Sequence, residues 1–192
     1  GELIMAARTG TLVPHTWEFS PEDLPSVNPR NLMASLRTDL YSKGAAKADG
    51  WLVAVLHGEF DPVSCLFRLH AHLVADGEMV AIADRLRELP KYRTARFLPN
   101  GQQSPVYRRV RIGRSDLTDL PDPLTYLCQA FWPSRAVFEN AEGVQRRQRQ
   151  KARIEEPYHS MVLLWLDRWT LADITLLIGL RASKAGLIRT SR

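Results

Sequence analysis

Two histidines, His70 and His72, stand one residue apart in residues 68–74, which read RLHAHLV. Successive side chains of a β-strand point to opposite faces, so on a strand these two imidazoles lie side by side on one face. Two neighbouring imidazoles can share one divalent metal ion. The spacing therefore predicts a metal site on a strand, with two hydrogen-bonded or exposed surface histidines as the alternative.

The elements around this pair predict where further metal ligands lie. Two apolar runs, residues 51–60 and 66–75, flank a turn-forming Asp-Pro pair and predict a β-hairpin. In the expected register His57 lies roughly opposite His70, and the two-residue alternation puts His57 and Glu59 on the metal face. Glu59 is the first candidate for a third ligand, and His57 is its nearest competitor.

Composition limits the class of protein. The chain has 192 residues, of which 45% are hydrophobic and 24% charged, as in an ordinary globular protein. No apolar run approaches the roughly 18 to 20 residues of a membrane span, so we expect a soluble protein with no membrane partner. Its two cysteines form neither a disulfide framework nor a metal-ligand cluster, and the first residues given have no charged-then-apolar pattern of a secretory leader, although a start at Gly1 without Met leaves a native leader open. These features favour the cytoplasm.

The charge balance is compatible with a nucleic-acid partner. The formal net charge is +5 and the sequence pI is about 9.5. Arginine dominates two basic stretches, residues 107–114 and 146–153, and arginine suits phosphate recognition. The candidate phosphate-binding residues there are Arg108, Arg109, Arg111, Arg146, Arg147, Arg149 and Lys151. A solvated basic face is the alternative for each stretch.

Periodicity and capping signals predict the other elements of the first 138 residues. We expect a short strand over residues 15–20, helices over 28–43 and 78–89, and a strand over 106–112, with residues 1–14 irregular. A short helix over 122–132 carries one apolar stripe, and Tyr126 lies off that stripe. The predicted fold class is α+β, with a central antiparallel sheet and packed helices.

The remaining chain divides into a basic linker, residues 139–157, and a helical unit, residues 158–192. In that unit we expect helices over 158–169, 170–178 and 182–189, the second opened by a capping box at Thr170. A glycine between the last two helices is typical of a helix-turn-helix that reads duplex DNA, although ordinary helical packing explains it as well. The last of these helices, which would be the recognition helix, would present Arg181 and Lys184 to a groove of the DNA.

The order strand, helix, hairpin with His-x-His, then helix with a lone Tyr resembles the HUH endonucleases, which include rolling-circle replication initiators, relaxases and single-strand transposases. The resemblance covers roughly residues 16–135. It implies a Mn²⁺ or Mg²⁺ cofactor, single-stranded or hairpin DNA as substrate, and Tyr126 as the nucleophile that becomes joined to a 5′ phosphate. Such proteins belong to bacterial, plasmid or mobile-element replication and DNA transfer.

One position departs from the family pattern. Gln129 stands where replication initiators of this family have Lys. Either Gln129 hydrogen-bonds the phosphate itself, or another cation such as Arg135 or Lys91 substitutes for the lysine. Alternatively the nuclease is degenerate and the chain is a non-catalytic, sequence-specific DNA-binding regulator. A third hypothesis is an ordinary basic α+β protein whose histidine pair has no metal.

Overall fold

The computed structural model describes residues 7–93, 108–117, 127, 132–134, 137–139, 143, 145–147, 151–184 and 186–190, with the backbone alone at 137–139 and 145–147. The α-helices in these ranges are α1 (Pro29–Ser42), α2 (Glu78–Arg85) and α4 (Tyr158–Leu166). Short 3₁₀ helices are η2 (Leu24–Ser26), η3 (Leu86–Glu88), η4 (Pro90–Tyr92) and η5 (Leu171–Ile174). The strands are β1 (Arg8–Leu12), β2 (Glu18–Phe19), β3 (Gly50–Asp61), β4 (Leu66–Gly77), β5 (Val110–Ile112), β6 (Pro133–Ser134), β7 (Val137–Glu139), β8 (Gln145–Arg147), β9 (Ala152–Arg153), β10 (Thr175–Ile178), β11 (Leu180–Ser183) and β12 (Gly186–Arg189).

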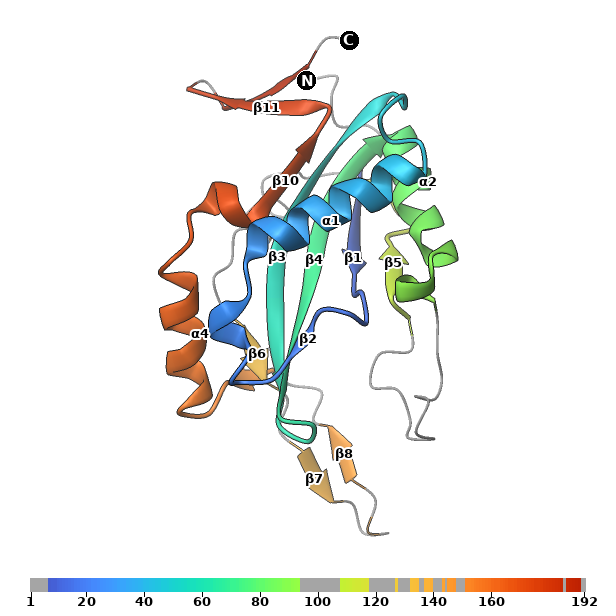
Figure 1. Ribbon diagram of the computed structural model, residues 1–192. Helices are drawn as coiled ribbons and strands as arrows, with labels where there is room; N and C mark the ends of the chain where they lie inside the picture. The colour runs from blue at the N-terminus through green and yellow to red at the C-terminus, as the bar shows by residue number, and fades with distance from the viewer. Residues whose placement is uncertain are drawn as a thin grey trace.

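The predicted α+β class with a largely antiparallel sheet is confirmed. The main sheet has the strand order β5-β1-β4-β3-β6-β9, with β10 also paired to β3 and β2 also paired to β4. All of these pairings are antiparallel except β3 with β6. The long hairpin of β3 and β4 therefore forms the middle of the sheet (Figure 1).

The hairpin register agrees with the sequence. His57 pairs with His70, Val55 with His72, and Glu59 with Arg68. Because directly opposed residues of an antiparallel pair share a face, all three histidines lie on one side of the sheet. The alternating apolar residues of β4, among them Leu69 and Leu73, are fully buried on the other side.

Helices α1 and α2 cover that other side, as Figure 1 shows where α1 crosses in front of the strands. The N-cap of α1 is Asn28, whose side chain accepts a hydrogen bond from the amide of Arg30, with Pro29 at the first helical position. Leu36 and Leu40 of α1 and Met79 of α2 are fully buried in this core. Both helices match the predicted ranges, although the second continues beyond Arg85 as a 3₁₀ turn, η3.

The irregular start predicted for residues 1–14 is wrong within the described residues. Residues 8–12 form β1, which lies between β4 and β5. Gly10 of β1 packs so closely on the sheet that an added Cβ would lie 2.9 Å from the side chains of Ile112 and Leu73. Tertiary pairing on both edges therefore stabilises this segment as a strand.

The prediction of a helical unit over residues 158–192 is also wrong in part. Helix α4 is present, and the Thr170 capping box forms with Asp173, but it opens only the 3₁₀ turn η5. The chain then forms β10, which pairs with β3, and the separate hairpin β11–β12. The predicted helix-turn-helix is thus replaced by strands, because β10 completes the open edge of β3 with backbone hydrogen bonds.

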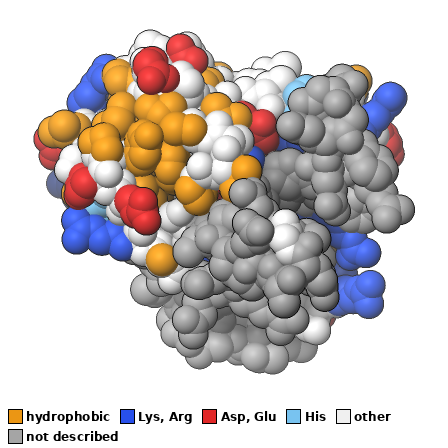
Figure 2. All heavy atoms as spheres, turned by 90° about the horizontal axis from the view of Figure 1, so that it is seen from below, with side chains coloured by type: hydrophobic (Ala, Val, Ile, Leu, Met, Phe, Trp, Pro, Cys, Tyr) orange, Lys and Arg blue, Asp and Glu red, His pale blue; other side chains and the backbone are white. Residues whose placement is uncertain are grey.

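Helix α4 is packed on the sheet through one face. Trp165 is 2% exposed, and its indole Nε1 donates a 3.0 Å hydrogen bond to the carbonyl of Val27. The opposite face is exposed, with Leu163 at 49% and Leu164 at 70%. Apolar side chains gather on the side where α4 lies when the molecule is viewed from below (Figure 2). None of the helices in the described ranges has both the length and the apolar character of a membrane span.

Candidate functional site

The three histidines of the hairpin, His57, His70 and His72, form one cluster, here called the histidine triad. The ring centroids of His57 and His72 are 4.7 Å apart, and those of His70 and His72 are 4.8 Å apart. The Nε2 atoms of His70 and His72 approach to 3.2 Å. His57 is buried at 5% exposure, and the other two are half-buried. Strand alternation and hairpin register alone bring these rings together.

Hydrogen bonds to the backbone indicate which ring nitrogens carry a proton. Nδ1 of His70 lies 3.4 Å from the carbonyl of Arg68, and Nε2 of His57 lies 2.7 Å from the carbonyl of Leu127. A carbonyl only accepts, so these two nitrogens donate, and the other nitrogen of each neutral ring keeps a lone pair. Nε2 of His70, which faces His72, therefore carries a lone pair.

A residue outside the sequence prediction orients the third ring. The hydroxyl of Thr11 lies 3.1 Å from Nδ1 of His72. Thr11 was missed because residues 1–14 were expected to be irregular, although Thr9 and Thr11 alternate with Gly10 and Leu12 as in a strand. A hydroxyl can donate or accept, so Nε2 of His72 either donates to His70 or presents a second lone pair to it.

The separation of the two Nε2 atoms fits a shared cation. Two nitrogens about 2.1 Å from one metal lie about 3.0 to 3.4 Å apart, between octahedral and tetrahedral angles. His70 and His72 also each hold their second nitrogen through a hydrogen bond, as metal-bound imidazoles commonly do. Among the described residues, however, no three His, Cys, Asp or Glu side chains are already placed to hold a metal ion. His57 directs its Nε2 to Leu127 instead.

The environment keeps the triad uncharged at neutral pH. Burial lowers the pKa of His70 to about 3, and the neighbouring His72 and His57 act in the same direction. Burial also lowers the pKa of His72 to about 3, with smaller contributions from His57, Lys151 and Arg111. The pKa of His57 is lowered mainly by burial. Neutral imidazole is the form that binds metal ions.

Glu59 lies on the triad face, as the register predicts, but its carboxylate is close to a buried arginine. Arg68 is only 3% exposed. Its Nη1 lies 4.0 Å from Oε1 of Glu59 and its Nε lies 3.2 Å from Oε1 of Glu18. Its Nη2 also pairs with the buried Asp61. This network compensates the buried guanidinium with several carboxylates. Glu59 is thus drawn toward Arg68, whereas His57 is in ring contact with both other histidines.

The predicted nucleophile Tyr126 and its neighbour Gln129 lie outside the described residues. Leu127, which directly follows Tyr126 in the chain, is described and is 3% exposed. It packs with Val53, Val55 and other residues on the triad face, and its carbonyl accepts the hydrogen bond from His57. The chain next to Tyr126 therefore contacts the histidine triad directly.

Lys91, a proposed substitute cation, and its neighbour Tyr92 contact the same carboxylate, that of Asp39. Tyr92 is fully buried and its hydroxyl donates a 2.9 Å hydrogen bond to Asp39. Burial and the charge of Asp39 both raise the pKa of Tyr92, which opposes its use as a nucleophile. Lys91 pairs with the same carboxylate at 2.7 Å. The second proposed substitute cation, Arg135, lies outside the described residues.

The predicted phosphate-binding residues are distributed unevenly. Five of them are exposed: Arg108 and Arg111 at β5, Lys151 beside β9, and Arg181 and Lys184 in the β11–β12 hairpin. Arg109 is different: it is 3% exposed and donates to the carbonyl of Val13 at 3.2 Å, and burial lowers its pKa. The side chains of Arg146 and Arg147 and the whole of Arg149 lie outside the described residues.

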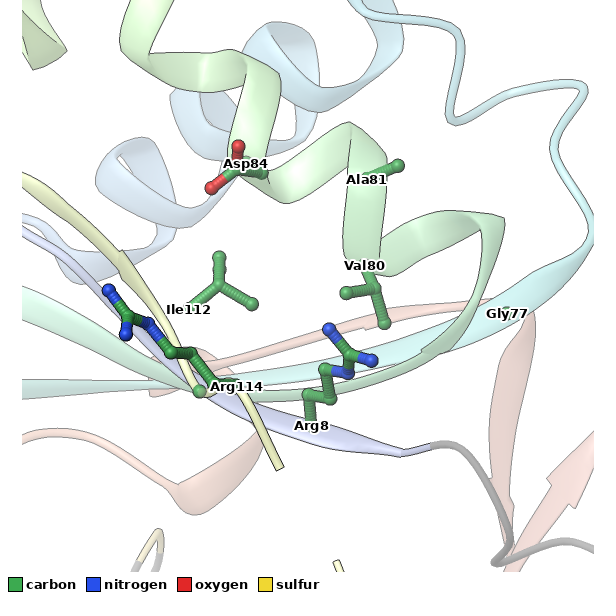
Figure 3. Close-up of a pocket in the computed structure, with 8 residues that line it drawn as sticks. Arg8, Gly77, Val80, Ala81, Asp84, Ile112 and Arg114 are labelled. Carbon is green, nitrogen blue, oxygen red and sulfur yellow. The ribbon is translucent and has the colours of Figure 1, made fainter. Parts of the chain in front are cut away.

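A pocket of about 630 Å³ lies between α2 and the strands β1 and β5 (Figure 3). Val80 and Ile112 contribute apolar surface to it, and Arg8 and Arg114 contribute two guanidinium groups. Arg8 pairs with Asp116 at 3.0 Å. Arg8 is opposite Ala75 in the register, on the helix side of the sheet, so this pocket is separate from the triad.

The chain was compared with protein-family models, curated proteins and solved structures, and none of them matches it.

Proposed function

We propose that this protein is a metal-dependent endonuclease and strand transferase of HUH type, which acts on single-stranded DNA through a 5′-phosphotyrosine intermediate. The observation that carries the proposal is the 3.2 Å approach of the His70 and His72 Nε2 atoms, supported by the hydrogen bond from His57 to the residue after Tyr126. These contacts join a predicted metal site to the chain that bears the predicted nucleophile.

In this proposal His70 and His72 hold a Mn²⁺ or Mg²⁺ ion through Nε2. The third protein ligand is His57 rather than Glu59, because His57 contacts both rings and Glu59 is held toward Arg68. His57 must release the Leu127 carbonyl, or use Nδ1, to take this role. A bound divalent ion would polarise the non-bridging oxygens of a phosphate and disperse the charge that develops there.

The residues of this chain perform the remaining steps. The phenol oxygen of Tyr126 attacks the phosphorus and forms a phosphotyrosine ester, while the bond from phosphorus to the 3′ oxygen breaks. The proton lost by the phenol balances the proton gained by the departing 3′ hydroxyl. Positioning accounts for much of the rate of such a reaction. The ester retains the energy of the broken bond, so attack by a 3′ hydroxyl rejoins the strand.

Capture of the covalent intermediate tests this proposal. The protein is incubated with Mn²⁺ and end-labelled single-stranded oligonucleotides, and label that stays on the protein after denaturation is measured. We expect an adduct with wild type and with Tyr41→Phe, a control that changes a 46% exposed tyrosine of α1. We expect no adduct with Tyr126→Phe, which should still bind DNA. Adduct formation by Tyr126→Phe would overturn the assignment of the nucleophile. Binding without any adduct in wild type would favour a non-catalytic DNA-binding regulator.

A further inference from the structure

Two cations flank the histidine triad from opposite ends of the sheet. In the strand order β5-β1-β4-β3-β6-β9, the histidine strands β4 and β3 occupy the middle. Arg111 belongs to β5 at one end, and Lys151 directly precedes β9 at the other. Both side chains are exposed. The triad thus lies on a sheet face with one positive charge toward each edge.

The register places Arg111 in line with the triad. Thr11 of β1 pairs with His72 on one side and with Arg111 on the other. Laterally paired residues share a face, so Arg111 and His72 are on the same side of the sheet, two strands apart. Nε of Arg111 donates to the carbonyl of Arg108 at 3.3 Å, and within the described residues no carboxylate pairs with it. Its charge is therefore available to a ligand on the triad face.

Lys151 reaches the triad from the β3 side. The next residue, Ala152, pairs with Ser134, and Ser134 pairs with Phe60 of β3. Phe60 belongs to the core on the helix side, so Ser134 and Ala152 share that side and the neighbouring Lys151 alternates to the triad side. A sheet face that carries two exposed cations attracts anions, and the phosphates of a nucleic acid are the anions that the proposed function places there.

We propose that Arg111 and Lys151 bind backbone phosphates on either side of the phosphate held at the triad, so that a single DNA strand crosses the sheet face from the β5 edge to the β9 edge. This inference rests on the proposed function, which places the reacting phosphate at the triad. It adds the path of the substrate, transverse to the β-strands, and two residues that fix this path.

The dimensions and the chemistry of the two side chains agree with this path. Five inter-strand intervals of about 4.8 Å give at most about 24 Å between the edge strands. Single-strand-binding modules commonly cover about 4 to 16 nucleotides, so one strand spans this distance. The guanidinium of Arg111 can bind a phosphate through two parallel hydrogen bonds, and the ammonium of Lys151 binds as a point charge.

Site-directed crosslinking of metal-free protein tests the path. Arg111→Cys and Lys151→Cys are each labelled with a thiol-reactive photocrosslinker and irradiated with an oligothymidylate of about eight nucleotides, a length within the range of one binding module. We expect crosslinks from the two positions to map toward opposite ends of the oligonucleotide. Labelled wild type gives the background from Cys65 and Cys128, and labelled Lys47→Cys is a control from the exposed loop after α1. Crosslinks from both positions to the same end, or none above background, would overturn the path.

Neutral variants give a second measurement. Arg111→Gln and Lys151→Gln should each weaken oligothymidylate binding and reduce the slope of log affinity against log salt by about 0.7, the value for one single-strand phosphate contact. Arg37→Gln on α1 and Lys47→Gln remove the same charges on the helix side of the molecule and should leave the slope unchanged. Unchanged slopes in the two test variants would contradict the contacts.

The two proposals fail separately. If wild type forms the Tyr126 adduct but both crosslinks map to one end, the path is wrong and the nuclease proposal stands. If the crosslinks map to opposite ends but no metal supports an adduct, the nuclease proposal is wrong and the single-strand path stands.

Discussion

The carbonyl oxygen of Leu127 accepts a 2.7 Å hydrogen bond from Nε2 of His57, two residues that are 70 positions apart in the chain. This bond links the strand hairpin to the segment that contains Tyr126. It also occupies the nitrogen that His57 would otherwise turn toward the other two histidines. The same contact therefore positions the segment and competes with metal binding by His57.

Variants of the two candidate third ligands should separate their roles. We expect His57→Gln to weaken Mn²⁺ binding by at least about 10- to 100-fold, because His57 contacts both other rings. That is the usual effect of removing a residue that only orients a metal ligand, so the loss of a ligand should be no smaller. Glu59→Gln should leave the affinity within a few-fold of wild type, since its carboxylate faces Arg68. Titration calorimetry measures both, with His70→Gln as the variant expected to abolish binding. A larger loss in Glu59→Gln than in His57→Gln would restore Glu59 as the ligand.

Thr11 should act on the metal through the orientation of His72. Replacing Thr11 by Val keeps the shape but removes the hydroxyl 3.1 Å from Nδ1 of His72, so we expect about 10- to 100-fold weaker Mn²⁺ binding. Thr11→Ser keeps the hydroxyl and should retain most of the affinity. If Thr11→Ser and Thr11→Val lose affinity equally, packing of β1 rather than the hydrogen bond is responsible.

Gly58 allows the close approach of an indole ring to β3. An added Cβ would lie 2.5 Å from Cε3 of Trp132, which is 3% exposed and whose ring lies 5.6 Å from that of Trp165 between centroids, tilted by 50°. Gly58→Ala should therefore destabilise the fold by about 1–3 kcal/mol, the usual cost of overpacking. Urea denaturation measures the loss. In a Trp132→Leu background the same substitution should cost much less, and equal costs in both backgrounds would argue against this clash.

Asp173 should make stability depend on pH in the acid range. Its carboxylate accepts hydrogen bonds from Arg30 at 2.6 Å and from the amide and hydroxyl of Thr170, which together lower its pKa to about 2. The unfolded chain, with an Asp pKa of about 3.9, binds more protons between these values. The stabilisation is thus complete above about pH 4 and is lost as the pH falls toward 2.

Comparison of Asp173→Asn with wild type measures this dependence. The difference in melting temperature between the two proteins should be largest at neutral pH and should shrink as the pH approaches 2. Asp167→Asn, an exposed carboxyl just after α4, is the matched control and should show no such trend. A difference between wild type and Asp173→Asn that stays constant from pH 7 to pH 2 would contradict the assignment.

The hairpin and its histidine face could be predicted because local signals and tertiary structure agree there. The two apolar runs and the Asp-Pro turn determine the register, and the two-residue alternation then places His57, His70 and His72 on one face. Helix α1 was equally clear, since Asn28 and Pro29 form a strong start signal. In these segments propensity, capping and burial all favour the same structure.

The errors lie where tertiary pairing decides the structure. Ile174 and Ile178 have helical spacing, but Thr175–Ile178 pairs with the edge of β3, where alternate residues of a strand are buried. Gly186 adopts φ of +111°, a conformation that favours glycine, in the turn of the β11–β12 hairpin rather than inside a helix. The partner of β10 is β3, which is far away in the sequence, so a local pattern could not reveal that pairing, whereas β11 and β12 form a local hairpin.

The outer edge of β3 is shared between two partners that do not meet. Strand β10 pairs with Leu52–Val55 and β6 with Phe60, and within the described residues no strand pairs with β3 between them. At this interruption Leu127 lies against the triad face, while Trp132, only five residues later, belongs to the core on the opposite face. A single continuous strand would instead cover the whole of this edge of β3. Leu127 and Trp132, close together in the chain, contact opposite faces of the sheet, so the residue that packs on Gly58 is only five positions from the residue that accepts the hydrogen bond of His57.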